Sequence, residues 1–332
     1  MKMKKWIEYQ LKNKQLSMPI LTFPCTQLIG CTVDQLVHDS RLQAQGMVAI
    51  AKKYPMSAAL TMMDLSVEAE AFGAEVRFSP IEVPTVVGLL LPDIEAAKKL
   101  LVPVIGEKRT KIYLATVEKV KMEITDRLIF AGVTGPFTMA GRLMDMTEIM
   151  INCYIDPEFV HVTLEKTTEF LINYILEFKK RGAGGIVMAE PAAGLLSPEL
   201  CLEFSSTYIK RIKDAVDDED FIFIYHNCGN VKPLLNSIFS IGADAYHFGN
   251  ATNMIDVLAV APNDAIIMGN IHPVHEFNYG TPASIKKATL DLLEKCGKFH
   301  QFVISSGCDI PAQSKLENID AYFMAINQYY RL

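Results

Sequence analysis

The residues best suited to chemistry are His226 and Cys228, at the end of an apolar run, and Cys308 in a distant segment. In an extended chain, residues two apart project to the same side, so His226 and Cys228 can contact one ion. Zn²⁺ binds imidazole nitrogen at about 2.0–2.1 Å and thiolate sulfur at about 2.3 Å, and Cys308 would be a third soft ligand. Three protein ligands leave one coordination position open, as in catalytic zinc sites. The single residue between His226 and Cys228 is also shorter than the spacing in a zinc finger.

A purely structural interpretation is the alternative. Cysteine is often buried as a small hydrophobic residue, and a histidine at a strand end is often only hydrogen-bonded. Both segments, however, are apolar runs that lead into a glycine-containing turn, at Gly229 and at Gly307. Both also place a soft ligand at the carboxyl end of an expected strand, and this agreement favours the metal site.

The composition predicts a folded protein without a nucleic-acid or membrane partner. The chain has 332 residues, of which 50% are hydrophobic, and this is ample material for a core. The formal net charge is −6, and no cluster of Lys and Arg offers a surface for nucleic acid. The longest apolar stretches, such as 83–91, are too short to span a bilayer. The seven cysteines lack the spacing of a disulfide scaffold and no apolar signal core follows Met1, so we expect a reduced, cytoplasmic protein.

Eight strand-like runs alternate with helical segments along the chain. They lie at 19–23, 57–63, 128–133, 185–189, 221–225, 243–248, 265–268 and 301–304. Repeated strand–helix units predict right-handed crossovers and a parallel sheet, and eight of them fit a closed (β/α)8 TIM barrel. An open doubly wound sheet is the alternative, but no Gly-x-Gly-x-x-Gly follows the first strand. We expect one α/β barrel domain over residues 1–332, with an N-terminal helical extension and an inserted flap around residues 75–90.

The barrel gives the metal hypothesis a geometry. The carboxyl ends of the strands meet at one mouth, where active sites of this fold lie. His226 and Cys228 follow the fifth strand and Cys308 follows the eighth, so these side chains are expected to face each other across the mouth.

Other polar residues are expected at the same mouth. Asp64, Glu190 and His272 each follow a predicted strand and are the candidate catalytic residues. Asn250 and Asn270, in the turns after two later strands, are the candidates for binding the cofactor.

The expected ligand set also indicates a reaction. Two thiolates and a neutral imidazole give a zinc site of net charge zero, which is a weaker Lewis acid than a site with three histidines. Such a site can bind a substrate thiol and lower its pKa. Alkyl transfer to or from sulfur is therefore the natural reaction, and hydrolysis by zinc hydroxide is the competing one.

Several motifs resemble those of the uroporphyrinogen decarboxylase superfamily. Within it, the chain is similar to the branch of corrinoid-dependent methyltransferases typified by methylcobamide:coenzyme M methyltransferase. The similarity covers nearly the whole chain, and the His-x-Cys…Cys signature is its specific part. The motifs are His226-Asn227-Cys228-Gly229-Asn230, Met268-Gly269-Asn270-Ile271-His272-Pro273, Ser305-Ser306-Gly307-Cys308-Asp309-Ile310-Pro311, Glu317-Asn318-Ile319, Gly135-Pro136-Phe137-Thr138, Leu196-Ser197-Pro198, and Asp64 with residues 68–73.

This resemblance implies a barrel fold and a zinc ion at His226, Cys228 and Cys308. It also implies methyl exchange with methylcobalamin, a corrinoid supplied by a partner protein. In this branch a zinc-activated thiolate attacks a methyl group held on cobalt, whereas related branches demethylate methylated compounds and load the corrinoid. The expected partners are therefore a corrinoid protein and a small-molecule methyl donor or thiol acceptor.

The chain departs from the family pattern at three positions. His272 stands where the family usually has Asp, Asp309 where it has a small residue, and Glu190 where Asp is expected. Glu190 could be a fourth ligand, could hydrogen-bond a zinc ligand, or could be a polar residue at the mouth. These changes leave the identity of the methyl donor and acceptor open.

Two other functions are the alternatives. Decarboxylation of uroporphyrinogen, a tetrapyrrole with many carboxylates, calls for clustered arginines, which bind carboxylates bidentately. The segment 23–30 contains none, and the chain has eight in total. A barrel that only binds a ligand is the non-enzymatic alternative. His247, His272 and His275 form a second possible cluster, which we interpret as hydrogen-bonded groups that line the pocket.

Overall fold

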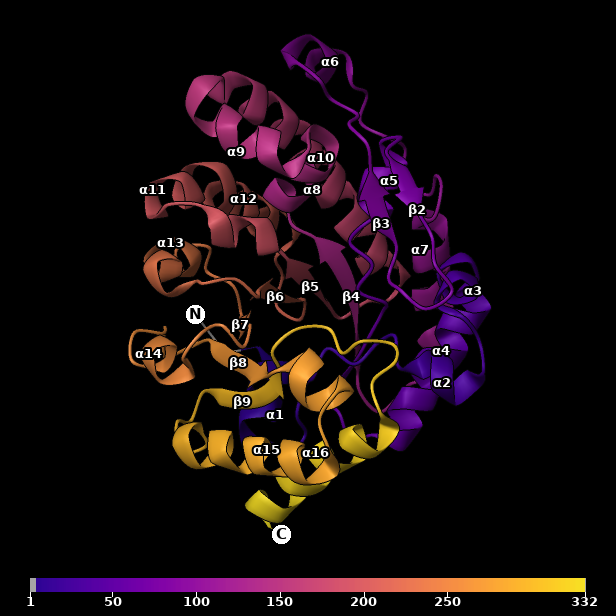
Figure 1. Cartoon of the computed structure of the whole chain (residues 1–332), viewed down its shortest axis with the longest axis vertical. Coiled ribbons are helices and arrows are strands. Elements are labelled where there is room, and N and C mark those ends of the chain that lie inside the picture. Colours follow the sequence, from indigo (N-terminus) through magenta and orange to yellow (C-terminus); the bar gives the residue numbers. More distant parts are fainter. Residues whose placement is uncertain (1–3, 332) are drawn as a thin grey trace.

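Seven parallel strands form a curved sheet at the centre of the computed structural model, which describes residues 4–331 (Figure 1). Their order in the sheet follows the order in the chain, with β2 and β3 outside it. The strands are β1 (Ala58–Leu60), β4 (Leu128–Thr134), β5 (Gly185–Ala189), β6 (Ile222–Asn227), β7 (Ala245–Phe248), β8 (Ile266–Ile271) and β9 (Phe302–Ser306). Sequential parallel strands joined by helices give the predicted (β/α)8-type barrel.

The prediction of a first strand at 19–23 is wrong. Pro19 has no N–H to donate to a ladder, and the N–H of Leu21 donates locally to the Pro19 carbonyl, at 2.9 Å. The segment 17–22 therefore has no ladder pairing, although it occupies the place of the eighth strand.

Segment 17–22 nevertheless closes the ring between β9 and β1. On one side, Ser305 Oγ donates to the Met18 carbonyl at 2.7 Å, and Ser306 Oγ accepts from the Ile20 N–H at 3.0 Å. On the other side, the N–H of Ser57, just before β1, donates to the Ser17 carbonyl at 3.3 Å. Side-chain hydroxyls of β9 thus replace the backbone ladder at this closure.

The amino-terminal end of the barrel is covered by helix α1 (Lys5–Lys12). The Trp6 ring packs edge-on against Phe130, with the centroids 5.0 Å apart, and its Nε1 donates to the Ser57 carbonyl at 3.3 Å. Trp6 and Ile7 belong to the same apolar cluster as the inward-facing residues of the strands. The barrel interior is therefore a packed core, and space for a substrate is expected at the other end.

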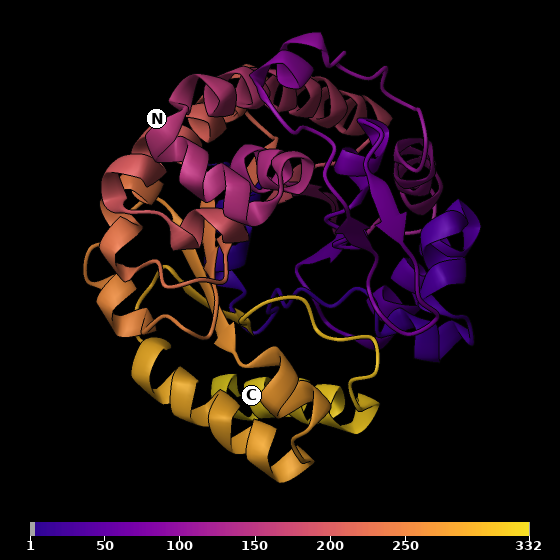
Figure 2. The ribbon, with the colours of Figure 1, turned by 45° about the horizontal axis from the view of Figure 1, so that its top comes forward.

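Helices form an outer ring around the strands (Figure 2). They are α2 (Cys25–Ile29), α3 (Val33–His38), α4 (Ser40–Lys53), α5 (Val67–Ala71), α6 (Ile94–Lys99), α7 (Thr110–Val120), α8 (Pro136–Met144), α9 (Met146–Ile155), α10 (Pro157–Arg181), α11 (Pro198–Cys201), α12 (Thr207–Val216), α13 (Leu235–Phe239), α14 (Met254–Leu258), α15 (Pro282–Cys296) and α16 (Leu316–Tyr330). Within residues 4–331, none of them combines the length and the apolar character that crossing a bilayer requires.

A hairpin lies outside the barrel sheet, in the region where the sequence predicts a flap. Its strands β2 (Glu75–Arg77) and β3 (Thr85–Val87) pair in antiparallel register. Phe78, which follows β2, lies against the Arg109 guanidinium at 4.9 Å. The hairpin therefore covers the charged residues that follow β1.

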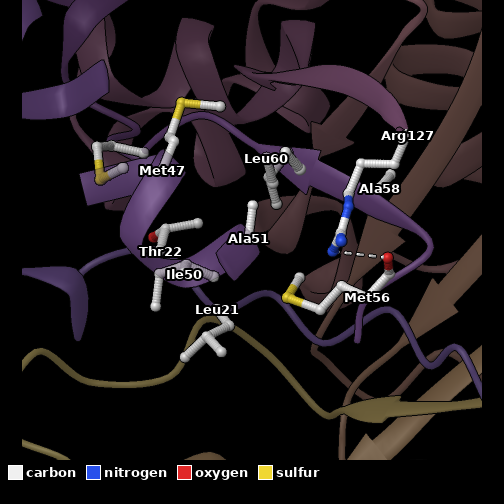
Figure 3. A pocket seen from close by; sticks show the side chains of 11 residues that line it. Leu21, Thr22, Met47, Ile50, Ala51, Met56, Ala58, Leu60 and Arg127 are labelled. Atoms are coloured by element: carbon white, nitrogen blue, oxygen red, sulfur yellow. Dashed lines mark hydrogen bonds between the residues drawn. The ribbon is translucent and has the colours of Figure 1, made fainter. Parts of the chain in front are cut away.

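A small cavity between α4 and β1 is not a candidate substrate site (Figure 3). Its volume is about 10 Å³, which is room for one water molecule at most. Met47, Ile50 and Leu60 line it, and Arg127 lies at its edge, where Nη1 donates to the Met56 carbonyl at 3.0 Å.

Candidate metal centre

The structure brings the three predicted ligands together at the carboxyl ends of β6 and β9. His226 lies in β6, Cys228 follows that strand, and Cys308 follows β9. Their ligand atoms all lie within 4.8 Å of one another, and Cys308 Sγ is 3.5 Å from His226 Nε2. Sulfur and nitrogen ligands that bind zinc tetrahedrally lie about 3.5 Å apart, given bond lengths of about 2.3 and 2.0–2.1 Å. The donor set and its spacing therefore fit a zinc ion.

The last inward-facing residues of β6, β7 and β9 are polar and lie at the mouth of the barrel. Ile222 and Ile224 of β6 belong to the barrel core, and His226 continues the same face. In the same way His247 continues the face of Ala245 in β7, and Ser305 that of Val303 in β9. Apolar residues thus fill the barrel, and polar residues take over where the strands end.

Two glycines allow the loops around the ligands to approach closely. A Cβ on Gly249 would lie 2.5 Å from the Cα of Cys228, and a Cβ on Gly307 would lie 2.7 Å from the backbone nitrogen of Asn250. The loop after β7 therefore lies against both ligand-bearing loops. Any side chain at Gly249 would force the Cys228 loop to move.

Asn250 and Asn270 lie on or next to this loop. Asn250 is exposed and lies beside Gly307, the residue that precedes Cys308. The Asn270 amide donates to the Gly249 carbonyl at 2.9 Å and to the Thr252 carbonyl at 2.6 Å, so it fixes the course of the loop. That these residues bind a cofactor stays a prediction.

His247 is hydrogen-bonded, as the sequence analysis interpreted it, but its partners are His226 and Ser305 and not His272 or His275. Its Nδ1 lies 2.8 Å from Nδ1 of His226, which is its register partner on the neighbouring strand, and its Nε2 lies 2.7 Å from Ser305 Oγ. The available signal was that both histidines stand just before the ends of consecutive strands. Burial lowers the pKa of His247 well below its ordinary value.

The two sulfurs influence each other. A hydrogen bond from the Cys308 thiol, assisted by His226, lowers the pKa of Cys228 well below its ordinary value. The same pairing, together with burial, raises the pKa of Cys308. The two pKa shifts are opposite in direction because one sulfur donates the hydrogen bond and the other accepts it, and a metal ion binds both cysteines as thiolates.

Asp64, a predicted catalytic residue, lies in a separate ionic network. Its carboxylate pairs with the Arg109 guanidinium, accepts from Ser66 Oγ at 2.6 Å, and accepts from the Tyr113 hydroxyl at 3.0 Å. The side chain has no exposed surface, so a substrate does not reach it in this conformation. A catalytic role for Asp64 stays a prediction.

Glu190 holds the start of helix α8 and does not act as a fourth ligand in this structure. Its carboxylate accepts from the N–H groups of Phe137 and Thr138, at 3.0 and 2.5 Å, where the helix dipole favours an anion. Burial raises the pKa of Glu190 to about 7. Within residues 4–331, no carboxylate joins the His226, Cys228 and Cys308 group.

His272, the third predicted catalytic residue, is exposed at the rim. Its Nδ1 accepts from the His275 N–H at 3.2 Å and caps the turn Pro273–Asn278. It lies outside the metal group, and its catalytic role stays a prediction.

The structure is thus a parallel barrel with one imidazole and two thiols at its mouth, a group that could hold a metal ion. The model of the family "Uroporphyrinogen decarboxylase (URO-D)" matches residues 18–329, so this chain belongs to that family.

The relatives have two kinds of activity. The chain is 24% identical over 310 residues to the uroporphyrinogen decarboxylase of Hydrogenovibrio crunogenus, which covers 88% of this chain and 84% of that protein. It is also 24% identical over 272 residues to the methylcobamide:CoM methyltransferase MtbA of Methanosarcina acetivorans, covering 80% and 78%. Among solved structures, a methyltransferase from Methanosarcina mazei superimposes with a TM-score of 0.86 at 23% identity, over 97% of this chain and 99% of that one. The last similarity supports the fold.

Proposed function

We propose that this protein is a zinc-dependent methyltransferase that moves a methyl group between a corrinoid, carried by a partner protein, and a thiol or another small acceptor or donor. The observation that carries the proposal is the set of three soft ligand atoms within 4.8 Å at the barrel mouth. The similarity to a methylcobamide:CoM methyltransferase supports it.

His226, Cys228 and Cys308 would hold the ion. When bound there, zinc would lower the pKa of a substrate thiol in its fourth coordination position, so that a thiolate forms near neutral pH. His226 can offer Nε2 because its Nδ1 is engaged with His247. The low pKa of Cys228 provides one thiolate, and Cys308 must give up its proton for the second.

Residues at the rim are the proposed contacts for the reactants. Asn250 and His272 are exposed there, on the loops after β7 and β8, and both can hydrogen-bond a polar group. Glu190 and Asp64 would act on these loops only indirectly, because their carboxylates are buried against α8 and Arg109.

Decarboxylation of a tetrapyrrole is the second candidate, and the decarboxylase relatives favour it. Such a substrate needs free arginines for its carboxylates. Arg109, which lies under the hairpin, is instead held by Asp64 and Glu70. This pairing makes Arg109 unavailable to a substrate carboxylate, whereas Arg142 has a buried Nε without a hydrogen-bond partner among residues 4–331.

The test combines metal analysis with a transfer assay. We expect about one zinc per purified chain, and transfer of the methyl group of free methylcobalamin to at least one member of a panel of small thiols. Cys31→Ser is the matched control, because Cys31 is also half-buried but lies outside the metal group. A chain that binds no zinc and decarboxylates uroporphyrinogen would overturn the proposal.

A further inference from the structure

Four groups form a continuous hydrogen-bonded chain behind the metal group. His226 Nδ1 lies 2.8 Å from His247 Nδ1, His247 Nε2 lies 2.7 Å from Ser305 Oγ, and Ser305 Oγ donates to the Met18 carbonyl at 2.7 Å. Both rings are about 2% exposed, and Ser305 is fully buried. Water therefore does not supply alternative partners for these atoms.

The Met18 carbonyl, at one end of this hydrogen-bonded chain, sets the direction of every hydrogen bond in it. A carbonyl oxygen can only accept, so the single hydrogen of Ser305 is committed to Met18. Ser305 Oγ must then accept from His247, which places a proton on His247 Nε2. A neutral imidazole carries one proton, so His247 Nδ1 is an acceptor.

The direction of the hydrogen bond between His226 and His247 follows from the same reasoning. Two ring nitrogens 2.8 Å apart share one hydrogen, and with His247 Nδ1 accepting, that hydrogen belongs to His226 Nδ1. The His247 carbonyl, 3.2 Å from the same nitrogen, can only accept and agrees with this direction. The lone pair of His226 is thereby left on Nε2, the atom that faces Cys308 Sγ at 3.5 Å.

We infer that His247 and Ser305 are positioning residues that fix the His226 tautomer and ring orientation for metal binding. The Met18 carbonyl is the fixed acceptor at the end of this hydrogen-bonded chain. This inference rests on the proposed zinc function, and it adds two residues that do not touch the metal. The reverse direction would need a doubly protonated His247, which would be a buried cation with no carboxylate among its hydrogen-bond partners.

The first test reads the tautomer in the metal-free protein. Long-range ¹⁵N–¹H correlation spectra of the histidine-labelled chain at about pH 8, above the ordinary histidine pKa, distinguish Nδ1–H from Nε2–H. His226→Ala assigns the signal by its loss. We expect Nδ1–H at His226 and Nε2–H at His247, and an Nε2–H tautomer at His226 would overturn the inference.

The second test measures zinc affinity by competition with a chelator. In His247→Asn the amide oxygen takes the place of Nδ1 and can still accept, whereas His247→Leu removes the acceptor. We expect His247→Leu to weaken zinc binding by about 10–100-fold, as is typical for residues that orient a metal ligand, and His247→Asn to retain most of the affinity. Equal affinity of His247→Leu and the wild-type chain would overturn the inference.

Two neighbouring serines separate positioning from simple stability. Ser305 and Ser306 both bond to segment 17–22, but only Ser305 also contacts His247. Ser305→Ala should weaken zinc binding, whereas Ser306→Ala should leave it unchanged, although both variants should melt earlier. Equal zinc affinities in the two variants would contradict the positioning role of Ser305.

Failure of the proposed function would look different. In that case the wild-type chain would bind no zinc or transfer no methyl group, whatever residue stands at position 247. The tautomer spectrum needs neither zinc nor activity, so it decides the inference on its own, including the case in which His247→Leu does not fold.

Discussion

Two clusters of ionisable side chains lie at the carboxyl ends of barrel strands, and they differ in how their charges are satisfied. Beyond β1, Arg109 bonds Asp64, Glu70 and Ser66, and the hairpin residue Phe78 covers it. At the ends of β6 and β9, the ligand atoms of His226, Cys228 and Cys308 lie within 4.8 Å of one another. In the first cluster the charges of Asp64 and Arg109 are paired within the protein, whereas the second gathers donors that a metal would use.

The comparison shows that position in a barrel does not assign a role by itself. Asp64 follows a strand at the end where active sites lie, yet its oxygens are taken up by Arg109, Ser66 and Tyr113. Removing one partner of such a buried ion pair destabilises the fold, because the other charge is left buried without compensation. The hydrogen-bond partners of a residue therefore distinguish the two clusters better than its place at a strand end does.

The largest expected effect is at the metal group. Cys308→Ser removes a soft ligand and should lower zinc content and methyl transfer by more than about a hundredfold, since even residues that merely support a ligand cost about 10–100-fold. Zinc analysis and the transfer assay measure both quantities. Full transfer by a zinc-free Cys308→Ser variant would remove the distinction between the two clusters.

Next comes the charged cluster. Asp64→Asn leaves the Arg109 guanidinium short of a buried partner and should lower the free energy of unfolding by about 3–5 kcal/mol, while zinc content stays unchanged. Denaturant unfolding measures the loss. The matched control is Glu165→Gln, whose partner Arg211 is exposed, and which should cost less than about 1 kcal/mol. Loss of zinc in Asp64→Asn would show that the clusters are coupled.

The third prediction concerns pH and the buried Glu68. Burial raises the pKa of Glu68 from 4.5 to about 7, so the folded state keeps a proton that the unfolded state has lost. Its contribution to the free energy of unfolding therefore falls as the pH rises from about 4.5 to about 7, by on the order of 3 kcal/mol.

Glu68→Gln isolates this contribution. A glutamine can still accept from the Thr134 N–H and can donate to the Thr134 hydroxyl, the two groups that Glu68 contacts at 2.9 Å. Compared by denaturant unfolding at about pH 5 and about pH 8, the wild-type chain should lose stability relative to the variant. A difference that does not change with pH would show that Glu68 does not hold this proton in the folded state.

The smallest effect is expected at the rim. His272 is exposed and makes one capping hydrogen bond, so His272→Ala should change the free energy of unfolding by less than about 0.5 kcal/mol and leave zinc in place. A slower transfer at unchanged zinc content would support contact with a reactant, and an unchanged rate would remove His272 from the proposed site.

Local patterns in the sequence predicted the barrel and the metal group. Apolar runs identify β4 to β9, and the spacing of His226 and Cys228 on one face of β6 needs no tertiary information. Parallel topology then brings Cys308 to the same mouth.

Long-range contacts decided what the sequence could not. Glu190 follows its strand as predicted, but its carboxylate is taken up by α8, which lies about fifty residues earlier in the chain. Nothing near Pro19 indicates that serines of β9 replace a strand ladder. The partner of His247 depends on the register of β6 and β7, which periodicity does not give.

The closure of the ring through Met18 has a thermodynamic consequence. If the Met18 carbonyl fixes the hydrogen-bonded chain that ends at His226, then the ordering of segment 17–22 and the binding of the ion are thermodynamically coupled. Linkage is reciprocal, so whatever free energy the ordered segment adds to zinc binding, zinc returns to the ordering of that segment. Metal loading should therefore slow amide hydrogen exchange at residues 17–22, although these residues are not ligands.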